Sequence, residues 1–76
     1  MKNPAEIKSF GTHLRRVREE HNLSQQPLAD LADIAKITIQ RIENAKFTVT
    51  LDVLISISKA LNIELSILLN YSNENN

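Results

Sequence analysis

The sequence predicts an all-α protein, folded as one small domain of five short helices. Its 76 residues include one glycine, Gly11, and two prolines, Pro4 and Pro27. So few turn-forming residues cannot support a sheet of many strands, whereas windows rich in Leu, Ile and Ala favour helices. The length suits a single domain, expected over residues 1–71, and the polar residues 72–76 are expected to form a frayed tail.

The first helix is predicted over residues 5–21. Its inward positions recur at spacings of three and four, which is the period of an amphipathic helix. The residues at these positions are Ile7, Phe10, Leu14, Val17 and His21. Gly11 lies within this helix, where a glycine costs about 1 kcal/mol relative to alanine. A helix of this length tolerates that cost.

The second helix is predicted to begin after Ser24, because serine is a favoured N-cap. Pro27 would stand at the third helical position, where its missing N–H removes the amide that Ser24 would otherwise bond. The expected inner face consists of Leu28, Ala29, Leu31 and Ala32.

A tight turn at residues 33–34 is expected to lead into a third helix over residues 35–43. Ile39, Ile42 and Ala35 are predicted to face inward on this helix, by their spacing of three and four. The opposite side would carry Lys36, Ile37, Gln40, Arg41 and Asn44.

The fourth helix is predicted over residues 51–61, with Thr50 as its N-cap. Its apolar stripe would be formed by Leu51, Leu54, Ile55, Ser58 and Leu61. A break at residues 62–63 precedes a short fifth helix over residues 64–70. Leu65, Leu68 and Leu69 are expected to be buried where the fifth helix closes the core. The other apolar residues of this end, Ile63, Ile67 and Tyr71, are expected to form a dimer interface.

Several classes of function are excluded by what the sequence lacks. There is no cysteine, and His13 and His21 are the only histidines, so we expect no disulfide, metal site or cofactor. No Gly-rich phosphate loop and no nucleophile–base pair is recognisable, so we expect no catalytic residues and no enzyme activity. Neither an apolar run long enough to span a membrane nor a signal peptide is present, which predicts a cytoplasmic protein.

The charge is unevenly distributed although the formal net charge is zero. Residues 1–48 hold eight Lys and Arg against six Asp and Glu, whereas residues 49–76 hold one against three. A zero net charge argues mildly against a nucleic-acid partner, since DNA-binding domains are usually basic. The asymmetry is nevertheless what a protein would show if one side faced phosphates.

The segment Leu23-Ser24-Gln25-Gln26-Pro27-Leu28-Ala29, followed by Ile39-Gln40-Arg41-Ile42-Glu43-Asn44, resembles the phage-repressor and Cro-like (XRE) helix-turn-helix family. The likeness needs no gaps from Gly11 to Leu69 and includes the leucine pattern of the fourth helix. It implies a five-helix, lambda-repressor-like DNA-binding domain with the helix-turn-helix at the second and third helices. The chain departs from the family pattern at Asp33 and Ala45, where glycine is usual, and at Pro27.

The resemblance implies that the third helix reads base edges in the major groove of double-stranded DNA. Lys36 and Arg41 can donate hydrogen bonds to guanine, and Gln40 can pair with adenine. Ile37 can cover a thymine methyl group; alternatively it is an incidental surface residue or a contact with another protein.

Further contacts are expected around this helix. The family places a DNA-contacting glutamine at Gln25, where the N-terminus of the second helix attracts a phosphate. Asn44 and Lys46 are placed for phosphate contacts that set register. Arg18 and Glu43 correspond to a structural ion pair of some family members; the alternative is two unrelated surface charges.

The expected function is therefore that of a transcriptional regulator binding a palindromic operator as a homodimer, with recognition helices ~34 Å apart. It would be a stand-alone repressor or the controller of a restriction-modification cassette. The alternative is an antitoxin-type subunit that uses the same fold mainly to bind a partner protein.

Overall fold

The computed structural model describes residues 3–46 and 48–71, and these residues form five helices without a strand. The helices are α1 (Pro4–Glu20), α2 (Gln25–Ala32), α3 (Lys36–Glu43), α4 (Leu51–Leu61) and α5 (Leu65–Leu68). The predicted all-α fold is thus confirmed. Within the described residues, no helix has both the length and the apolar character needed to cross a bilayer.

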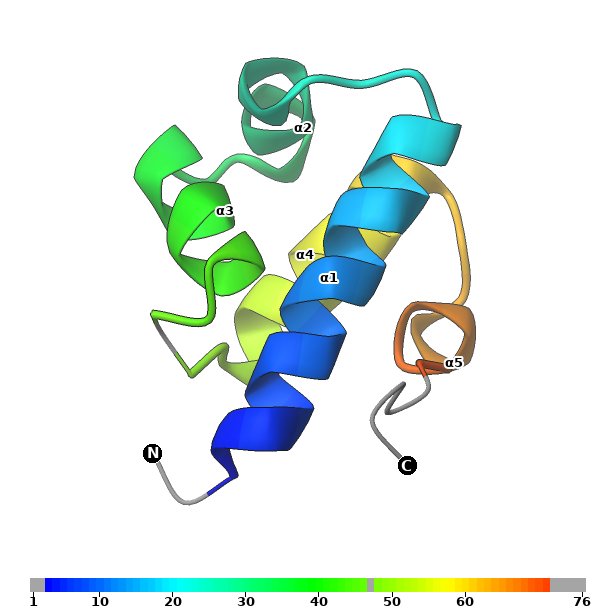
Figure 1. Ribbon diagram of the computed structural model, residues 1–76. Helices are drawn as coiled ribbons and strands as arrows, with labels where there is room; N and C mark the ends of the chain where they lie inside the picture. The colour runs from blue at the N-terminus through cyan, green and yellow to red at the C-terminus, as the bar shows by residue number, and fades with distance from the viewer. Residues whose placement is uncertain (1–2, 47, 72–76) are drawn as a thin grey trace.

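The helices form a bundle in which α1 packs on α3, α2 packs on both α3 and α4, and α5 packs on α4 (Figure 1). In that view α1 crosses in front of α4, with α2 and α3 to one side and α5 to the other. The principal extents of 32 × 21 × 20 Å describe a short, thick body. Because α3 lies at the edge of the bundle, one of its sides can face the core while the other faces solvent.

The helix ends lie close to their predicted positions. The fourth helix has the predicted bounds, and the hydroxyl of Thr50 accepts a 3.3 Å hydrogen bond from the Val53 amide. The first helix begins one residue early, at Pro4, because a proline suits the first helical position. Ala35 is the N-cap of α3 and not its first residue, and α5 is shorter than expected.

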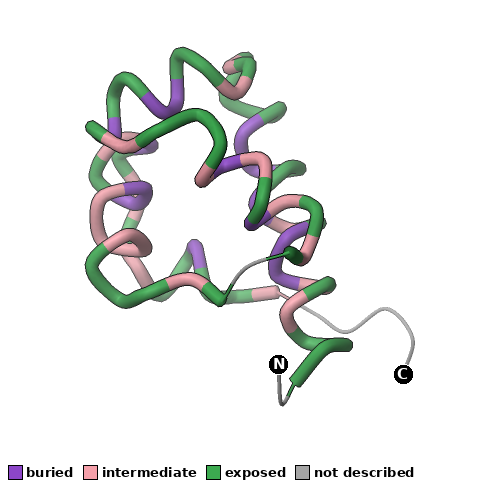
Figure 2. The backbone as a smooth tube through the Cα atoms, turned by 90° about the vertical axis from the view of Figure 1, so that its left-hand side faces the viewer, coloured by how far each residue is buried: buried purple, intermediate pink, exposed green. Residues whose placement is uncertain are grey.

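The core gathers apolar side chains from all five helices. Buried and exposed positions alternate along the chain as each helix turns one side inward (Figure 2). Its fully buried large side chains are Leu14, Leu28, Ile39, Ile42, Ile57 and Leu68. Ile57 was not assigned to the inner stripe of the fourth helix from periodicity, yet it is completely inaccessible.

In the first four helices, four residues predicted to face inward are exposed instead. Leu31 and Leu51 are each 61% exposed, and Ala35 and His21 also lie on the surface. Three of them stand at helix ends: Leu51, Ala35 and His21. At a helix end the apolar side can extend beyond the neighbouring helix that would cover it. Leu31 lies to the side of the Leu28, Ala29 and Ala32 face, so the inner face of α2 is narrower than predicted.

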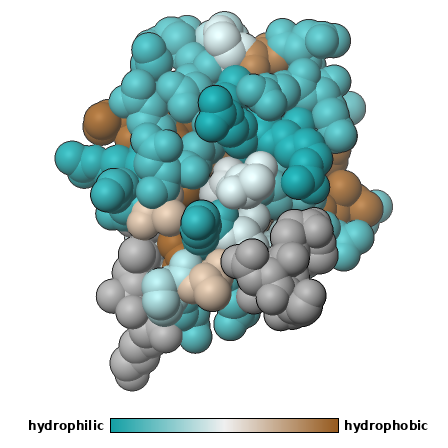
Figure 3. All heavy atoms as spheres, viewed as in Figure 1, coloured by the Kyte–Doolittle hydropathy of each residue, from teal (hydrophilic) through white to brown (hydrophobic). Residues whose placement is uncertain are grey.

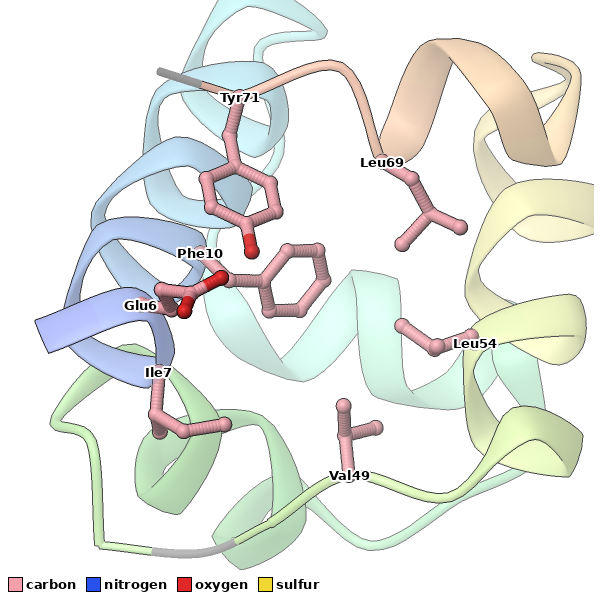
Figure 4. A pocket seen from close by; sticks show the side chains of 7 residues that line it. All are labelled: Glu6, Ile7, Phe10, Val49, Leu54, Leu69 and Tyr71. Carbon is pink, nitrogen blue, oxygen red and sulfur yellow. The ribbon is translucent and has the colours of Figure 1, made fainter. Parts of the chain in front are cut away.

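The C-terminal segment packs differently from the prediction. Tyr71 and Ile63 are partly buried against the core, and the Tyr71 ring meets Phe10 edge to face at 5.9 Å between centroids. Leu69, expected in the core, is 41% exposed. It lies beside a cavity of about 150 Å³, which the side chains in Figure 4 line from α1, the Val49 loop, α4 and the chain after α5.

Candidate nucleic-acid interface

The turn between α2 and α3 orients α3 against the domain. Asp33 adopts a left-handed conformation with φ 57°, and the Ile34 amide then donates to the Ala29 carbonyl at 3.0 Å. This closure is the Schellman motif, in which the residue after the helix is usually glycine. Aspartate tolerates the left-handed region better than most residues, so the turn forms without a glycine.

The inward side of α3 is fixed by two isoleucines. Ile39 is fully buried and Ile42 is 2% exposed, so the helix cannot rotate without exposing both side chains to water. The helix ends in a second Schellman motif, with Ala45 at φ 57° and the Lys46 amide donating to the Arg41 carbonyl at 2.8 Å. The recognition-type helix is therefore held along one side and at both ends.

The outward side of α3 carries the residues predicted to contact DNA. Lys36, Arg41 and Asn44 are exposed, and Gln40 is half-buried. Ile37 is 49% exposed, so this isoleucine contributes little to the core. Lys46 is also exposed, directly beyond the end of the helix. The structure thus brings these polar side chains and one apolar side chain onto a single solvent-facing surface.

A buried ion pair connects α1 with the end of α3. The Arg18 guanidinium donates through Nε to Glu43 Oε2 at 2.7 Å and through its second terminal nitrogen to Oε1 at 3.0 Å. The remaining terminal nitrogen of Arg18 donates to the Leu23 carbonyl at 2.8 Å. Side-chain exposures of 8% for Arg18 and 3% for Glu43 make this a bidentate pair largely withdrawn from water.

Gln25 joins the same network from the first position of α2. Its Nε2 donates to Glu43 Oε1 at 3.0 Å, so one carboxylate serves α1, α2 and α3 together. One N–H of the Gln25 amide is therefore engaged within the domain. The hydrogen bond fixes the position of the amide beside the N-terminus of α2, where a positive dipole end faces solvent.

The electrostatics of the pair follow from its geometry. Hydrogen bonds to the Glu43 carboxylate raise the pKa of Arg18 above its ordinary value, although burial opposes this by disfavouring the charged form. The guanidinium remains charged as the pH rises well past neutrality. Removing one partner of a buried pair typically costs ~3–5 kcal/mol, because the other charge is left without compensation.

The N-terminus of α2 has no side-chain cap. Ser24 has the extended backbone of an N-cap residue, yet its hydroxyl makes no capping hydrogen bond. Pro27 occupies the third helical position and has no amide proton to donate, as expected from the sequence. The first turn therefore keeps backbone amides without an intrahelical acceptor.

Sequence reasoning missed the role of Gly11. A Cβ atom built on Gly11 would collide with the Ile42 carbonyl oxygen and lie 3.0 Å from that of Glu43. The glycine therefore allows the backbones of α1 and α3 to approach closely. The signal was available, since a lone glycine inside a long helix usually has a packing reason.

These features define a class of protein. Two helices joined by a tight turn, the second gripped from behind and exposing a polar face, constitute a helix-turn-helix of the DNA-binding type. A helix-turn-helix family model matches residues 14–68. The chain belongs to this family, that of the phage-repressor and Cro-like (XRE) transcriptional regulators.

A curated relative and two solved structures resemble the chain. A candidate HTH-type transcriptional regulatory protein of Methanothermobacter thermautotrophicus is 39% identical over 57 residues, which are 75% of this chain. The match covers only 18% of that relative, so the chain spans less than a fifth of its length. The restriction-modification controller protein C.AhdI from Aeromonas hydrophila superposes with a TM-score of 0.82 and 31% identity, covering 84% of this chain and 97% of that one.

The second structure supports the fold alone. It is the clp gene regulator ClgR from C. glutamicum, with a TM-score of 0.78 and 20% identity, covering 84% of this chain and 82% of that one. At such low identity the likeness carries the helical architecture and no individual residue role.

Proposed function

We propose that this protein is a sequence-specific regulator of transcription that binds a palindromic operator as a homodimer. The observation that carries the proposal is the exposed face of α3, where Lys36, Gln40 and Arg41 stand opposite the buried Ile39 and Ile42. A helix anchored in this way can enter the major groove and present donors to base edges.

The residues on this face have distinct expected roles. Arg41 and Lys36 would donate to guanine, Gln40 would pair with adenine, and Ile37 would cover a thymine methyl group. Gln25, Asn44 and Lys46 surround the face, and their contacts would go to phosphates. The Gln25 amide has a second N–H for this purpose, since a side-chain amide carries two donors and Glu43 takes one.

The homodimer is supported by the apolar surface of α5. Ile67 is 54% exposed and Leu69 is 41% exposed, on a chain too short to build a large core of its own. Ile67, the more exposed of the two, would form the centre of the proposed interface. Ile63 and Tyr71, which are partly buried against the core, would contribute only their exposed edges.

The similarity to C.AhdI favours a DNA-binding regulator over an antitoxin-type subunit. That controller protein is matched over 97% of its length and 84% of this chain, and this likeness supports a similar role. We therefore favour a controller-like regulator over an antitoxin-type subunit, in which a partner protein would cover the apolar surface of α5.

The test is an unbiased selection of double-stranded DNA on the purified protein, followed by binding measurements on the enriched duplex. Replacing Gln40 or Arg41 by alanine should each weaken binding by ~1–3 kcal/mol and relax the preference at one base position. Lys46→Ala should instead weaken binding to all duplexes by a similar factor and reduce its salt dependence. Failure to enrich any sequence would contradict the proposal.

A further inference from the structure

We infer that α1 supplies a second set of phosphate contacts beside α3, made by Lys8 and Arg15 and not by Arg16. This inference rests on the proposed DNA binding and extends it beyond the helix-turn-helix. Besides Lys8, this helix carries His13, Arg15 and Arg16 as residues able to bind a phosphate, and the sequence alone does not distinguish the side that faces the duplex.

Two contacts identify the side of α1 that faces α3. The Cα of Gly11 lies against the Ile42 and Glu43 carbonyls, and the Arg18 guanidinium binds the Glu43 carboxylate. Gly11 and Arg18 are seven residues apart, which is two helical turns, so they lie on the same side of α1. This side meets the C-terminal end of α3.

Lys8 and Arg15 flank the contact. Lys8 comes three residues before Gly11, and Arg15 lies four residues after Gly11 and three before Arg18. Residues three and four apart are neighbours on a helix surface, so both side chains stand along the edge shared with α3. Both are exposed. They therefore continue the solvent-facing surface of α3 across its C-terminal end onto α1.

The other two candidates lie elsewhere on the helix. Arg16 follows Arg15 by one residue and is therefore rotated by about 100° around the helix axis, away from α3. His13 is partly buried, and its ring lies 6.4 Å from that of Tyr71, on the side of the C-terminal segment. Neither residue shares the edge that Lys8 and Arg15 occupy.

The carboxylates near this edge leave it positively charged. Glu43 is paired with Arg18 and withdrawn from water. Glu19 lies 3.7 Å from Arg15, but the two side chains are 60% and 62% exposed, so water screens their attraction. Hydrophilic side chains dominate the face over α1 and α3 in Figure 3. A chain with zero net charge can in this way present a basic surface to a phosphate backbone.

The experiment measures binding of the selected operator duplex over a range of salt concentrations. Log affinity falls as log salt rises, and each phosphate contact that is lost makes this negative slope shallower by about 0.9. Arg15→Ala and Lys8→Ala should each reduce the steepness of the slope by about this amount without changing the preferred bases. Arg16→Ala is the matched control, since it removes an exposed arginine from the same helix, and its slope should equal that of the wild type.

The outcomes separate this inference from the proposed function. Equal slopes for the wild type and Arg15→Ala, or equal reductions for Arg15→Ala and Arg16→Ala, would overturn the inference while leaving operator binding intact. A wild-type protein that binds no selected duplex would overturn the proposed function itself.

Discussion

Ala45 holds a backbone conformation that its side chain disfavours. Four helices end in Schellman motifs within the described residues, and the left-handed residues there are Asn22, Asp33, Ala45 and Asn62, all with φ near 57°. Asparagine and aspartate visit this region with little cost, whereas alanine is strained there by roughly 1–2 kcal/mol. The strained residue stands directly after α3, next to the proposed phosphate contacts.

Ala45→Gly should therefore stabilise the protein by about 1 kcal/mol. The relief of strain is partly offset because glycine gives the unfolded chain more freedom. For a domain of this size the gain corresponds to a rise in Tm of about 4–8 °C, measurable by thermal unfolding followed by circular dichroism. The same substitution at Ala5, which lies in α1, should lower Tm. A fall in Tm for Ala45→Gly would contradict the strain.

The left-handed residue after α3 could not be predicted from the sequence. From the sequence, either Ala45 or Asn44 can take the left-handed position after α3. The structure assigns it to Ala45, and the Lys46 amide donates to the Arg41 carbonyl. The residue types alone would favour the asparagine, so the position is set by where α3 ends in the folded chain and not by local preference.

Helices α1 and α3 contact each other through their backbones at Gly11. Gly11→Ala would increase the intrinsic helix propensity of α1 by about 1 kcal/mol. The new methyl group would nevertheless collide with the carbonyls of Ile42 and Glu43, and overpacking of this kind costs typically 1–3 kcal/mol. We expect a net loss of stability in urea unfolding. Thr12→Ala, at an exposed neighbour, should be neutral or slightly stabilising because alanine favours the helix. A stabilised Gly11→Ala variant would disprove the close approach.

A second prediction concerns the start of α2. The Ser24 hydroxyl makes no capping bond because Pro27 offers no amide, so Ser24→Ala should change the stability by less than about 0.5 kcal/mol. Pro27→Ala restores the amide, and in that background Ser24→Ala should cost about 1 kcal/mol. A double-mutant cycle measures the difference directly. Equal costs in both backgrounds would mean that the proline is not what prevents the cap.

Helix positions were predictable from the sequence because the three-and-four period extends over whole helices. Thr50 and Ser24 marked two of the helix starts, and both stand at N-cap positions. The inner faces were less predictable, as Leu31 and Leu51 illustrate. Periodicity assigns a residue to a stripe, but burial depends on how far the neighbouring helix reaches along that stripe, which is a property of the assembled bundle.

The distribution of charge belongs to the whole molecule. The outward faces of α1 and α3 carry Lys8, Arg15 and Arg41, and Lys46 follows α3 directly. Glu43 is neutralised inside by Arg18. The sequence indicated only that the first part of the chain is more basic than the second. Which cations share a face depended on the rotation of α1 against α3, and that rotation follows from the Gly11 and Arg18 contacts.

The proposed homodimer allows a test at the same scale with a matched control. Ile67 on α5 is 54% exposed and Leu31 on α2 is 61% exposed, so an aspartate at either position meets water in the monomer and should not unfold it. In an apolar dimer interface, however, two aspartates related by the two-fold axis would be desolvated and would repel each other. Ile67→Asp should therefore give the monomer mass in sedimentation equilibrium and a weaker affinity for a palindromic duplex. Leu31→Asp should retain the wild-type mass, and if Ile67→Asp retained it too, α5 would not be the interface.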